Sequence, residues 1–430
     1  MDNKQIIALI KREVVPAIGC TEPAAVALCT AYATEALGRR PERIEVELSA
    51  NMLKNAMGVG IPGTGMTGLP IAVALGALIG KSSYQLEVLK DCNAAAVLEG
   101  KAFLAGDRIR IGLTKQSEEV LYIEVRCHAG SDSSRAVIAR EHTGLVYLEG
   151  PSVKTVDRRD SLTASARTEA SDELTLRRVY DFATTAPLED IEFINEARRL
   201  NEAAAEASLK GNYGHELGKT LSRPLGKGIM GESIFSHIIS ATSSACDARM
   251  AGAMIPVMSN SGSGNQGIAA TLPVVVFARE NHNTEEELTR ALILSHLTAI
   301  YIKQSLGRLS ALCGCVVAST GSSCGITWLM GGGYDQVCAS VKNMIANRAG
   351  MVCDGAKPSC ALKVSSGVST AVLSAMLAVQ NHSVSSVEGL IEDDVDRCIH
   401  NITRLGSVGM QETDKMVLDI MTHKKNIRPE

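Results

Sequence analysis

Alternation between apolar and charged residues marks the first part of the chain. It runs through residues 44–48, 108–111 and 121–126, and again from 137 to 148 around a His-Thr-Gly break. A period of two is typical of strands with one buried face, and the break predicts a hairpin. Helical spacing appears over residues 4–15, up to Pro16, and over an alanine-rich stretch that ends at Leu37. These patterns predict a mixed α/β N-terminal part.

Apolar spacing becomes helical beyond residue 173. The predicted helices span 174–183, 190–211, 231–250, 284–306, 315–328, 336–347, 369–379, 394–403 and 412–421. Residues 155–173 are rich in charge, Ser, Thr and Ala and predict a linker. A chain of 430 residues also exceeds what one core usually supports. We therefore expect an α+β fold with a mixed α/β domain at 1–165 and a mainly helical domain at 166–430.

Composition narrows the classes of function. The net charge of −4 gives no basic surface for nucleic acid or for an anionic membrane. The longest apolar run, 68–80, is shorter than the roughly 20 residues of a membrane span and predicts a buried helix. The start of the chain lacks the pattern of a secretory signal, so we expect a cytoplasmic protein with reduced thiols. A small-molecule substrate fits best, and a homo-oligomer is compatible with these features.

Two glycine-rich stretches interrupt the predicted elements. The first, 58–70, precedes the apolar helix, and the second, 260–267, lies between apolar segments at 254–258 and 272–277. Turns of this kind expose backbone N–H groups that hold a carboxylate or phosphate. The first stretch lacks the Gly-Lys-Ser/Thr ending of a P-loop and a strand directly before it, which argues against a nucleotide; tight packing of two elements explains it equally well. We predict the second to be a flexible, donor-rich loop that lines a cleft.

A possible nucleophile or base lies near the N-terminus, at Cys20. The segment reads Gly19-Cys20-Thr21-Glu22-Pro23, in which Thr21 suits an N-cap and Pro23 the first helical turn. A thiol at a helix N-terminus is expected to have a lowered pKa, because the helix dipole stabilises the thiolate. Cys20 is thus a candidate reactive cysteine, although a small residue packed under a turn is an equally good reading.

Further cysteines are concentrated between residues 309 and 361. Cys313 and Cys315 precede a helical run, while Cys353 and Cys360 bracket a loop that contains Gly and Pro. Such a loop can wrap so that its thiolates turn to one point. The spacing matches no short paired zinc pattern, whereas three thiolates from two segments suit an iron–sulfur cluster with one iron free of protein ligands. Buried, inert cysteines are the alternative.

Five motifs together resemble the L-cysteine desulfidase family, which is related to the alpha chain of the iron–sulfur L-serine dehydratases. They are Gly19-Cys20-Thr21-Glu22-Pro23, Gly63-Thr64-Gly65-Met66, Asp247-Ala248-Arg249-Met250, residues 259–267, and residues 353–360 with their two cysteines. The resemblance covers about residues 13–414.

That resemblance implies a [4Fe-4S] cluster held by Cys353, Cys360 and one of Cys313 and Cys315. We favour Cys313, because the family is similar to this sequence at Leu-Cys, whereas the dehydratases show Gly-Cys at the first ligand, which would match Cys315. It also implies that Cys20 is the catalytic base.

The implied reaction is iron–sulfur-dependent β-elimination of L-cysteine to hydrogen sulfide, ammonia and pyruvate. Cys20 would take the Cα proton while the unligated iron, bound to the carboxylate, draws off charge. The two glycine-rich stretches would hold the carboxylate and amine. The predicted substrate-binding residues are Thr64, Gly65, Ser261, Gly262, Ser263 and Asn265.

Other functions remain open at this point. L-serine dehydration is the nearest alternative, because serine and cysteine differ only in the leaving group. A pyridoxal-phosphate lyase needs a Schiff-base lysine, and no lysine here has a recognisable context. A cysteine-rich redox sensor or cluster-binding regulator ranks lower, since a sensor does not need two loops for a small ligand.

Overall fold

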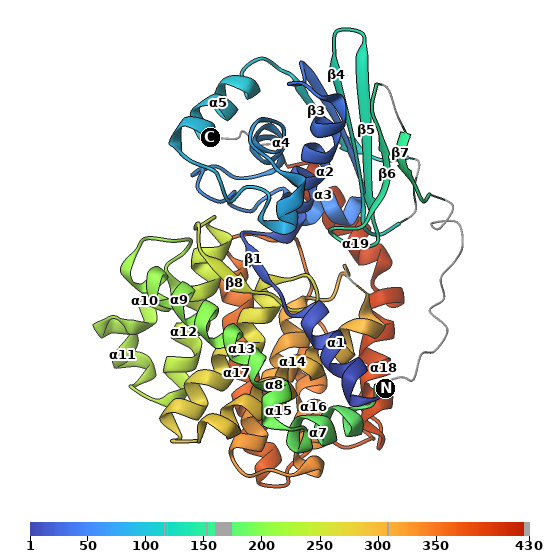
Figure 1. Cartoon of the computed structure of the whole chain (residues 1–430). Helices are drawn as coiled ribbons and strands as arrows, with labels where there is room; N and C mark the ends of the chain where they lie inside the picture. Colours follow the sequence, from blue (N-terminus) through green and yellow to red (C-terminus); the bar gives the residue numbers. More distant parts are fainter. Residues whose placement is uncertain (116, 118, 152–153, 160–173, 308, 425–430) are drawn as a thin grey trace.

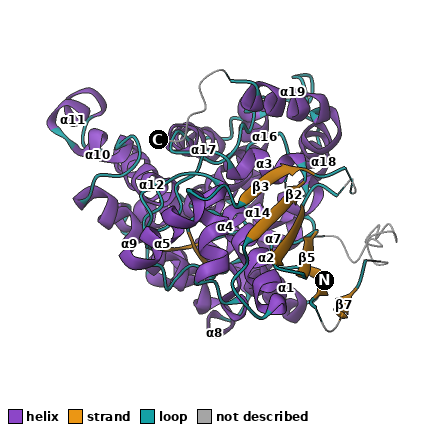
Figure 2. Ribbon diagram, turned by 90° about the horizontal axis from the view of Figure 1, so that it is seen from above, coloured by secondary structure: helices purple, strands orange, loops and turns teal. Residues whose placement is uncertain are grey.

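The computed structural model describes residues 1–430 except 116, 118, 152–153, 160–173, 308 and 425–430. A part built on a sheet lies above a mainly helical part in Figure 1. Seen from above, the strands lie together on one side of the molecule (Figure 2). The predicted α+β fold class is confirmed.

The larger sheet has the strand order β3-β2-β4-β5-β6-β7. Its strands are β2 (Arg43–Leu48), β3 (Ile109–Leu113), β4 (Tyr122–Ala129), β5 (Asp132–Ala139), β6 (Leu145–Glu149) and β7 (Lys154–Asp157). β2 and β3 are parallel, and the other neighbours are antiparallel. The predicted strands and the β5–β6 hairpin are confirmed. The predicted linker begins within β7, and its residues 160–173 lie outside the described residues.

Helices cover one face of this sheet. They are α2 (Thr21–Leu37), α3 (Ala50–Ala56), α4 (Leu69–Leu78), α5 (Ala94–Leu104) and the short η1 (Ser82–Glu87). α2 packs on β4 and β5, and α4 packs on α2. Leu28, Leu75 and Ile123 are fully buried in the core between them. The apolar run at 68–80 is therefore a buried helix, as predicted, with Pro70 in its first turn.

The helical part is organised around α15 (Gly314–Leu329), which packs against α13, α14, α16 and α17. The other elements here are α7 (Leu176–Thr185), α8 (Leu188–Ile191), η2 (Glu192–Ile194), α9 (Asn195–Lys210), α10 (Leu217–Ser222), α11 (Pro224–Met230), α12 (Ile234–Met250), α13 (Gly264–Glu280), α14 (Glu285–Leu306), α16 (Tyr334–Arg348), α17 (Cys360–Val379), α18 (Val395–Arg404), the π-helical η3 (Leu405–Gly409) and α19 (Gln411–Thr422). Most predicted helices are confirmed, but α17 begins nine residues before the predicted start, and α10, α11 and α13 were not predicted.

The first and the last described helices pack against elements that are distant in sequence. The apolar face of α1 (Asn3–Glu13) lies in the core of the helical part, and α19 contacts α3 of the sheet part. The predicted domain boundary near residue 165 stays a prediction.

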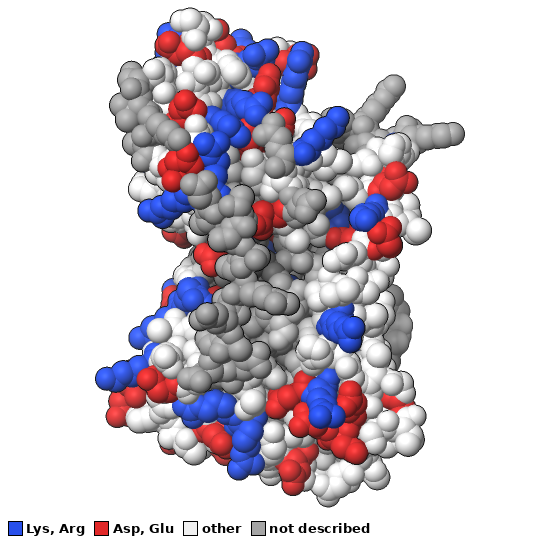
Figure 3. All heavy atoms as spheres, turned by 90° about the vertical axis from the view of Figure 1, so that its right-hand side faces the viewer, with Lys and Arg blue, Asp and Glu red and all other residues white. Residues whose placement is uncertain are grey.

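The distribution of surface charge and the apolar character of α17 are relevant to whether nucleic acid or a membrane is a partner. On the face shown in Figure 3, basic and acidic side chains alternate over both parts and form no field of a single sign. Among the described residues α17 is by length and composition long and apolar enough to cross a membrane, and half of its most apolar window is buried inside the protein.

Candidate active site

A two-stranded sheet joins the two parts of the molecule beside Cys20. β1 (Pro16–Ile18) pairs antiparallel with β8 (Pro256–Met258). The contact continues beyond the strands, because the backbone N–H of Ser259 donates to the carbonyl of Val15 at 2.9 Å. This pairing brings the segment before Cys20 alongside the second glycine-rich stretch, which is far away in sequence.

Cys20 is the N-cap residue of α2 and is only 3% exposed. Its thiol donates to Oε2 of Glu22 at 2.9 Å. Burial raises the pKa of Cys20 well above its ordinary value, the negative charge of Glu22 raises it further, and the positive charge of Arg249 opposes both. The predicted position at a helix N-terminus is confirmed. The predicted lowering of the pKa is wrong, because loss of water outweighs the helix dipole.

The residues around Cys20 reach both glycine-rich stretches. Thr21 was predicted to be the N-cap, but its hydroxyl donates to the carbonyl of Gly262 at 2.7 Å. Gly19 has φ of 72°, and a Cβ there would lie 2.4 Å from Cγ of Pro62. Only glycine permits this approach. On the other side, Asn55 Nδ2 donates to Oε1 of Glu22 at 3.3 Å.

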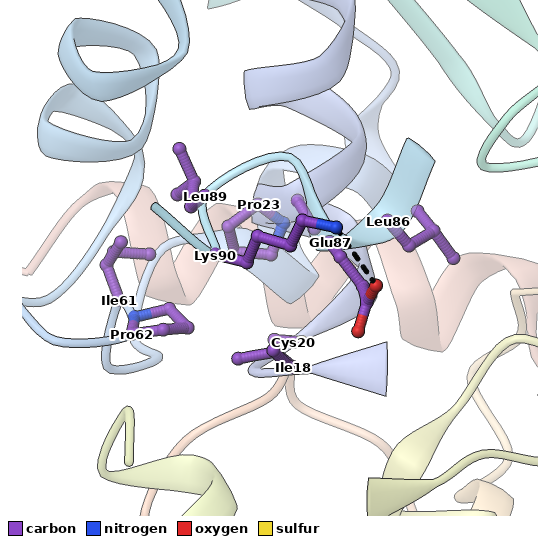
Figure 4. Close-up of a pocket in the computed structure, with 10 residues that line it drawn as sticks. Ile18, Cys20, Pro23, Ile61, Pro62, Leu86, Glu87, Leu89 and Lys90 are labelled. Carbon is purple, nitrogen blue, oxygen red and sulfur yellow. Dashed lines mark ion pairs between the residues drawn. The ribbon is translucent and has the colours of Figure 1, made fainter. Parts of the chain in front are cut away.

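A small cavity borders Cys20 on the sheet side. Figure 4 shows Lys90 above Cys20 and Ile18, with Pro62 beside them, and the ion pair of 3.9 Å between Glu87 and Lys90, which both line the cavity. Its volume of about 10 Å³ accommodates roughly one water molecule. This cavity is therefore too small to hold an amino acid.

The first glycine-rich stretch is a tight turn packed on the helical part. Gly60 N donates to Met250 O at 3.0 Å, and Gly63 N donates to Gly252 O at 3.1 Å. The hydroxyl of Thr64 donates to Ile61 O at 2.8 Å and accepts from Met66 N. The sequence allowed two interpretations of this stretch, ligand binding and tight packing of two elements. The tight packing is present. Substrate binding by Thr64 and by the exposed Gly65 stays a prediction.

The second glycine-rich stretch is shorter and more ordered than the flexible loop we expected. Helix α13 already begins at Gly264, and Ser263 caps it by accepting from Gln266 N at 3.4 Å. Ser261 has φ of 49° and Gly262 has φ of 79°, as a tight turn requires. Asn265 lies in the first helical turn and accepts from Arg249 Nη1 at 2.9 Å. Gly and Ser concealed this helix start in the sequence because both are poor helix formers.

The buried side chain of His296 contacts the turn before α13 and α13 itself. Asn260 Nδ2 contacts His296 Nδ1 at 3.1 Å, and Thr271 Oγ1 contacts His296 Nε2 at 3.0 Å. Ser261 Oγ in turn donates to Oδ1 of Asn260 at 2.9 Å. Burial lowers the pKa of His296 to about 3, so its ring is neutral and both contacts require a single tautomer. The network holds one wall of the candidate site in place.

The fold brings the predicted cluster ligands together from three segments. The backbone of Leu312 forms a bridge with Val352, which places Cys313 beside Cys353. Hydrogen bonding with Cys315, 3.0 Å away, raises the pKa of Cys313, whereas a hydrogen bond with Cys353 lowers it. Cys315 also contacts the sulfur of Met351 at 3.7 Å. Of the two candidates for the first ligand, both are buried, and Cys313 has the contact with Cys353.

Cys360, the third predicted ligand, begins α17 and is close to Cys246 on α12. Burial raises the pKa of Cys246 most, and negative charge on Cys360, and then on Cys313, raises it further. Within the described residues, however, no three His, Cys, Asp or Glu side chains stand in an arrangement that could hold a metal ion. The thiols are neighbours without coordinating geometry, so the ligand set stays a prediction.

A buried lysine links the sheet part to the predicted ligands. Lys54 on α3 is 1% exposed and forms an ion pair with Asp414 of α19. The same ammonium donates to the carbonyl of Cys353 at 3.4 Å. A groove of about 1030 Å³ between the two parts borders Lys54 and Asp414. This volume suits a small-molecule ligand.

Sequence reasoning assigned no role to two residues that the structure places beside Cys20. Glu22 lies in the quoted Cys20 motif, and Arg249 lies in the motif Asp-Ala-Arg-Met. A lone arginine near the end of a helix of mostly small residues was the available signal for Arg249. Nothing in the sequence indicated that the carboxylate of Glu22 accepts from the thiol.

Comparison with known proteins agrees with the predicted relationship. A family model described as serine dehydratase alpha chain matches residues 83–419, which include α12, α13 and the cysteines from Cys313 to Cys360. A Bacteroides thetaiotaomicron protein named UPF0597 protein is 68% identical over 423 residues, 98% of each chain. Proteins of the same name from Porphyromonas gingivalis and Photobacterium profundum are 52% and 44% identical over 428 and 420 residues, at least 97% of each chain. The chain therefore belongs to the serine dehydratase alpha-chain family, a family of lyase-type enzymes.

Proposed function

We propose that the protein catalyses iron–sulfur-dependent β-elimination of L-cysteine to hydrogen sulfide, ammonia and pyruvate. The chain belongs to a family of lyase-type enzymes, and three features that suit this reaction lie close to the end of α12. They are the buried thiol of Cys20, the turn before α13, and the cysteines of the α15 and α17 starts. Their proximity is the observation that carries the proposal. A cytoplasmic location is part of the proposal, and the free state of all twelve cysteines supports it.

The proposed cluster ligands are Cys313, Cys353 and Cys360. Thiolates are the usual ligands of iron–sulfur clusters, and these three thiols come from segments that the fold already brings together. The contact of Cys313 with Cys353 supports Cys313 over Cys315 as the first ligand. When bound, a [4Fe-4S] cluster supplies a Lewis acid that polarises the substrate.

Cys20 and Glu22 are the proposed proton-transfer pair. The thiol of Cys20 donates to Oε2 of Glu22, so transfer of that proton leaves a thiolate and a neutral carboxyl. Because the pKa of Cys20 is raised, this thiolate is a strong base toward a weakly acidic Cα–H. The electron pair of the Cα–H bond forms the double bond, the Cβ–S bond breaks, and Glu22 returns its proton to the departing sulfide. The aminoacrylate product then hydrolyses to pyruvate and ammonia.

The turn before α13 and the first glycine-rich turn are the proposed walls of the substrate site. Thr21 ties the first of these to the Cys20 segment through the carbonyl of Gly262. The hydroxyls of Thr64, Ser261 and Ser263 have partners within their own turns, and Nδ2 of Asn265 donates to Sδ of Met250 at 3.3 Å. Backbone N–H groups are therefore the main donors that these walls offer.

L-serine is the second candidate substrate, favoured by the description of the matching family. The test is anaerobic reconstitution with iron and sulfide, followed by parallel assays on L-cysteine and L-serine in which sulfide, pyruvate and ammonia are measured. Sulfide and pyruvate released in equal amounts from L-cysteine support the proposal. Pyruvate from L-serine alone assigns the protein as a dehydratase, and no product from either substrate refutes β-elimination.

A further inference from the structure

Arg249 carries a charge that the described part of the fold does not neutralise. It lies in the last turn of α12 and is 3% exposed. Burying a cation without a counter-ion costs several kcal/mol, so buried guanidinium groups normally pair with carboxylates. Among the described residues no acidic side chain forms an ion pair with Arg249, and its Nε has no hydrogen-bond partner.

Two other buried charges among the described residues have counter-ions. Lys54, 1% exposed, pairs with Asp414, and the buried carboxylate of Glu124 pairs with Arg126 and Arg135. Asp247, which is also fully buried on α12, has no ion pair within the described residues, but backbone N–H groups donate to its carboxylate. Arg249 has neither a described counter-ion nor a hydrogen-bond partner for Nε.

The guanidinium of Arg249 faces the start of α13. A Cβ on Gly264 would lie 2.2 Å from Nε, so glycine is needed for the side chain to occupy this position. Nη1 donates to Oδ1 of Asn265 at 2.9 Å. The N-terminus of α13, a helix of 17 residues, also favours negative charge at this point.

The same guanidinium is linked to both sides of the proposed site. Oδ1 of Asn265, which accepts from Arg249, also accepts from the thiol of Cys246 at 3.4 Å, and the charge of Arg249 acts on the thiol of Cys20. A carboxylate bound here would place the Cα of an amino acid within the same small region as Cys20. A fork of N–H donors suits the two oxygens of a carboxylate better than a point charge does.

We propose that Arg249 binds the α-carboxylate of a small amino-acid substrate through its unpaired Nε–H, with Asn265 holding the guanidinium in position. The substrate class rests on the proposed function, whereas the carboxylate contact does not depend on the elimination step. A purely structural arginine that fastens α12 to α13 is the competing explanation.

The test measures the binding of two ligands that cannot be eliminated, because neither has a leaving group on Cβ. Calorimetry on the iron-reconstituted protein compares L-alanine with L-alaninamide, which lacks the carboxylate. We expect the wild type to prefer L-alanine, and Arg249→Gln to weaken L-alanine binding about 10- to 100-fold while leaving that of L-alaninamide unchanged. Arg348→Gln is the matched control, since Arg348 donates to Thr370 and to Ser366 O without an ion pair.

Two results would overturn this assignment. One is a wild type without preference for L-alanine, and the other is a folded Arg249→Gln that keeps the wild-type preference. If Arg249→Gln fails to fold, Arg249→Lys decides: selective weakening of L-alanine supports the contact, and equal weakening of both ligands assigns a structural role. Absence of turnover on cysteine and serine would refute the proposed elimination but would leave this binding result standing.

Discussion

On the Cys20 side of the candidate site the side chains are paired with polar partners, whereas on the cysteine side the backbone is hydrogen-bonded and the thiols mainly contact one another. Cys20, Thr21 and Glu22 each have a polar partner, and His296 supports the turn that Thr21 contacts. By contrast Cys313 contacts two other thiols, and Cys360 has no side-chain partner among its described hydrogen bonds, which are a long contact of 3.7 Å to Gly355 O and a hydrogen bond with the backbone of Lys357.

This difference is compatible with the roles that we propose for the two sides. Donors for a substrate act best when their geometry exists before the substrate arrives. A metal group brings its own geometry, and its ligands need only to reach it, often with a gain in folding free energy. We therefore expect the cysteine side to depend on iron and the Cys20 side to be independent of it.

The largest expected effect comes from removing a proposed ligand. Cys353→Ser, Cys360→Ser and Cys313→Ser should each lose iron and activity together, because a three-thiolate site has no spare ligand. Cys315→Ser is the matched control and should keep both. Iron content and visible absorbance after anaerobic reconstitution measure this outcome. Loss of iron in Cys315→Ser with retention in Cys313→Ser would reassign the first ligand, and an iron-loaded, active Cys353→Ser would exclude the cluster.

The next prediction tests whether the Cys20 side acts independently of the iron that the cysteine side is proposed to bind. Cys20→Ala should lower kcat by about 10²- to 10⁴-fold, the usual contribution of a general base, while iron content and absorbance stay at the wild-type level. Cys29→Ala, a change of another buried cysteine on α2, should leave kcat near the wild-type value. Full activity in Cys20→Ala would remove the proposed base, and loss of iron in that variant would contradict the independence of the two sides.

Stability tests whether the two parts are joined through Lys54. Lys54→Met should destabilise the protein by about 3 kcal/mol, because it leaves Asp414 without its buried partner. Lys415→Met, which removes an exposed ion pair with Glu412 on the same α19, should cost less than about 0.5 kcal/mol. Urea unfolding of the two variants measures the difference. Equal changes in the free energy of unfolding would show that Lys54 does not stabilise the contact between the two parts.

At neutral pH the smallest effect concerns His296, because its ring is then neutral in both the folded and the unfolded state, and the effect grows as the pH falls. The pKa of His296 is lowered to about 3 in the folded chain, against about 6.5 when unfolded, so the folded state excludes a proton that the unfolded state binds. Stability from this residue is complete above about pH 6.5 and is lost as the pH falls toward 3, by up to about 1.4 kcal/mol per unit. Unfolding curves of wild type and His296→Gln between these pH values should diverge in slope. Parallel curves would mean that His296 is not held neutral.

The amino-acid sequence by itself determined features that depend on local spacing. Alternation over residues 44–48 predicted a strand because side chains of a strand point to opposite faces, and the run at 68–80 predicted a buried helix because all its faces are apolar. Pro23 in the first turn predicted the start of α2 to within one residue, with Thr21 as the N-cap where the structure has Cys20. The candidate ligands and the candidate base were predicted from residue type and from the family resemblance. A resemblance of this kind can be recognised without knowing where the residues lie in space.

The tertiary structure decided features that depend on neighbours distant in sequence. Pairing of β1 with β8 brings Cys20 to the turn before α13, and no local pattern predicts a three-residue strand. The pKa of Cys20 rises because burial removes water, a quantity that the helix N-terminus alone does not reveal. The unpaired charge of Arg249 is visible only once the side chains around it are known, since a sequence records that an arginine is present but not whether a counter-ion lies beside it.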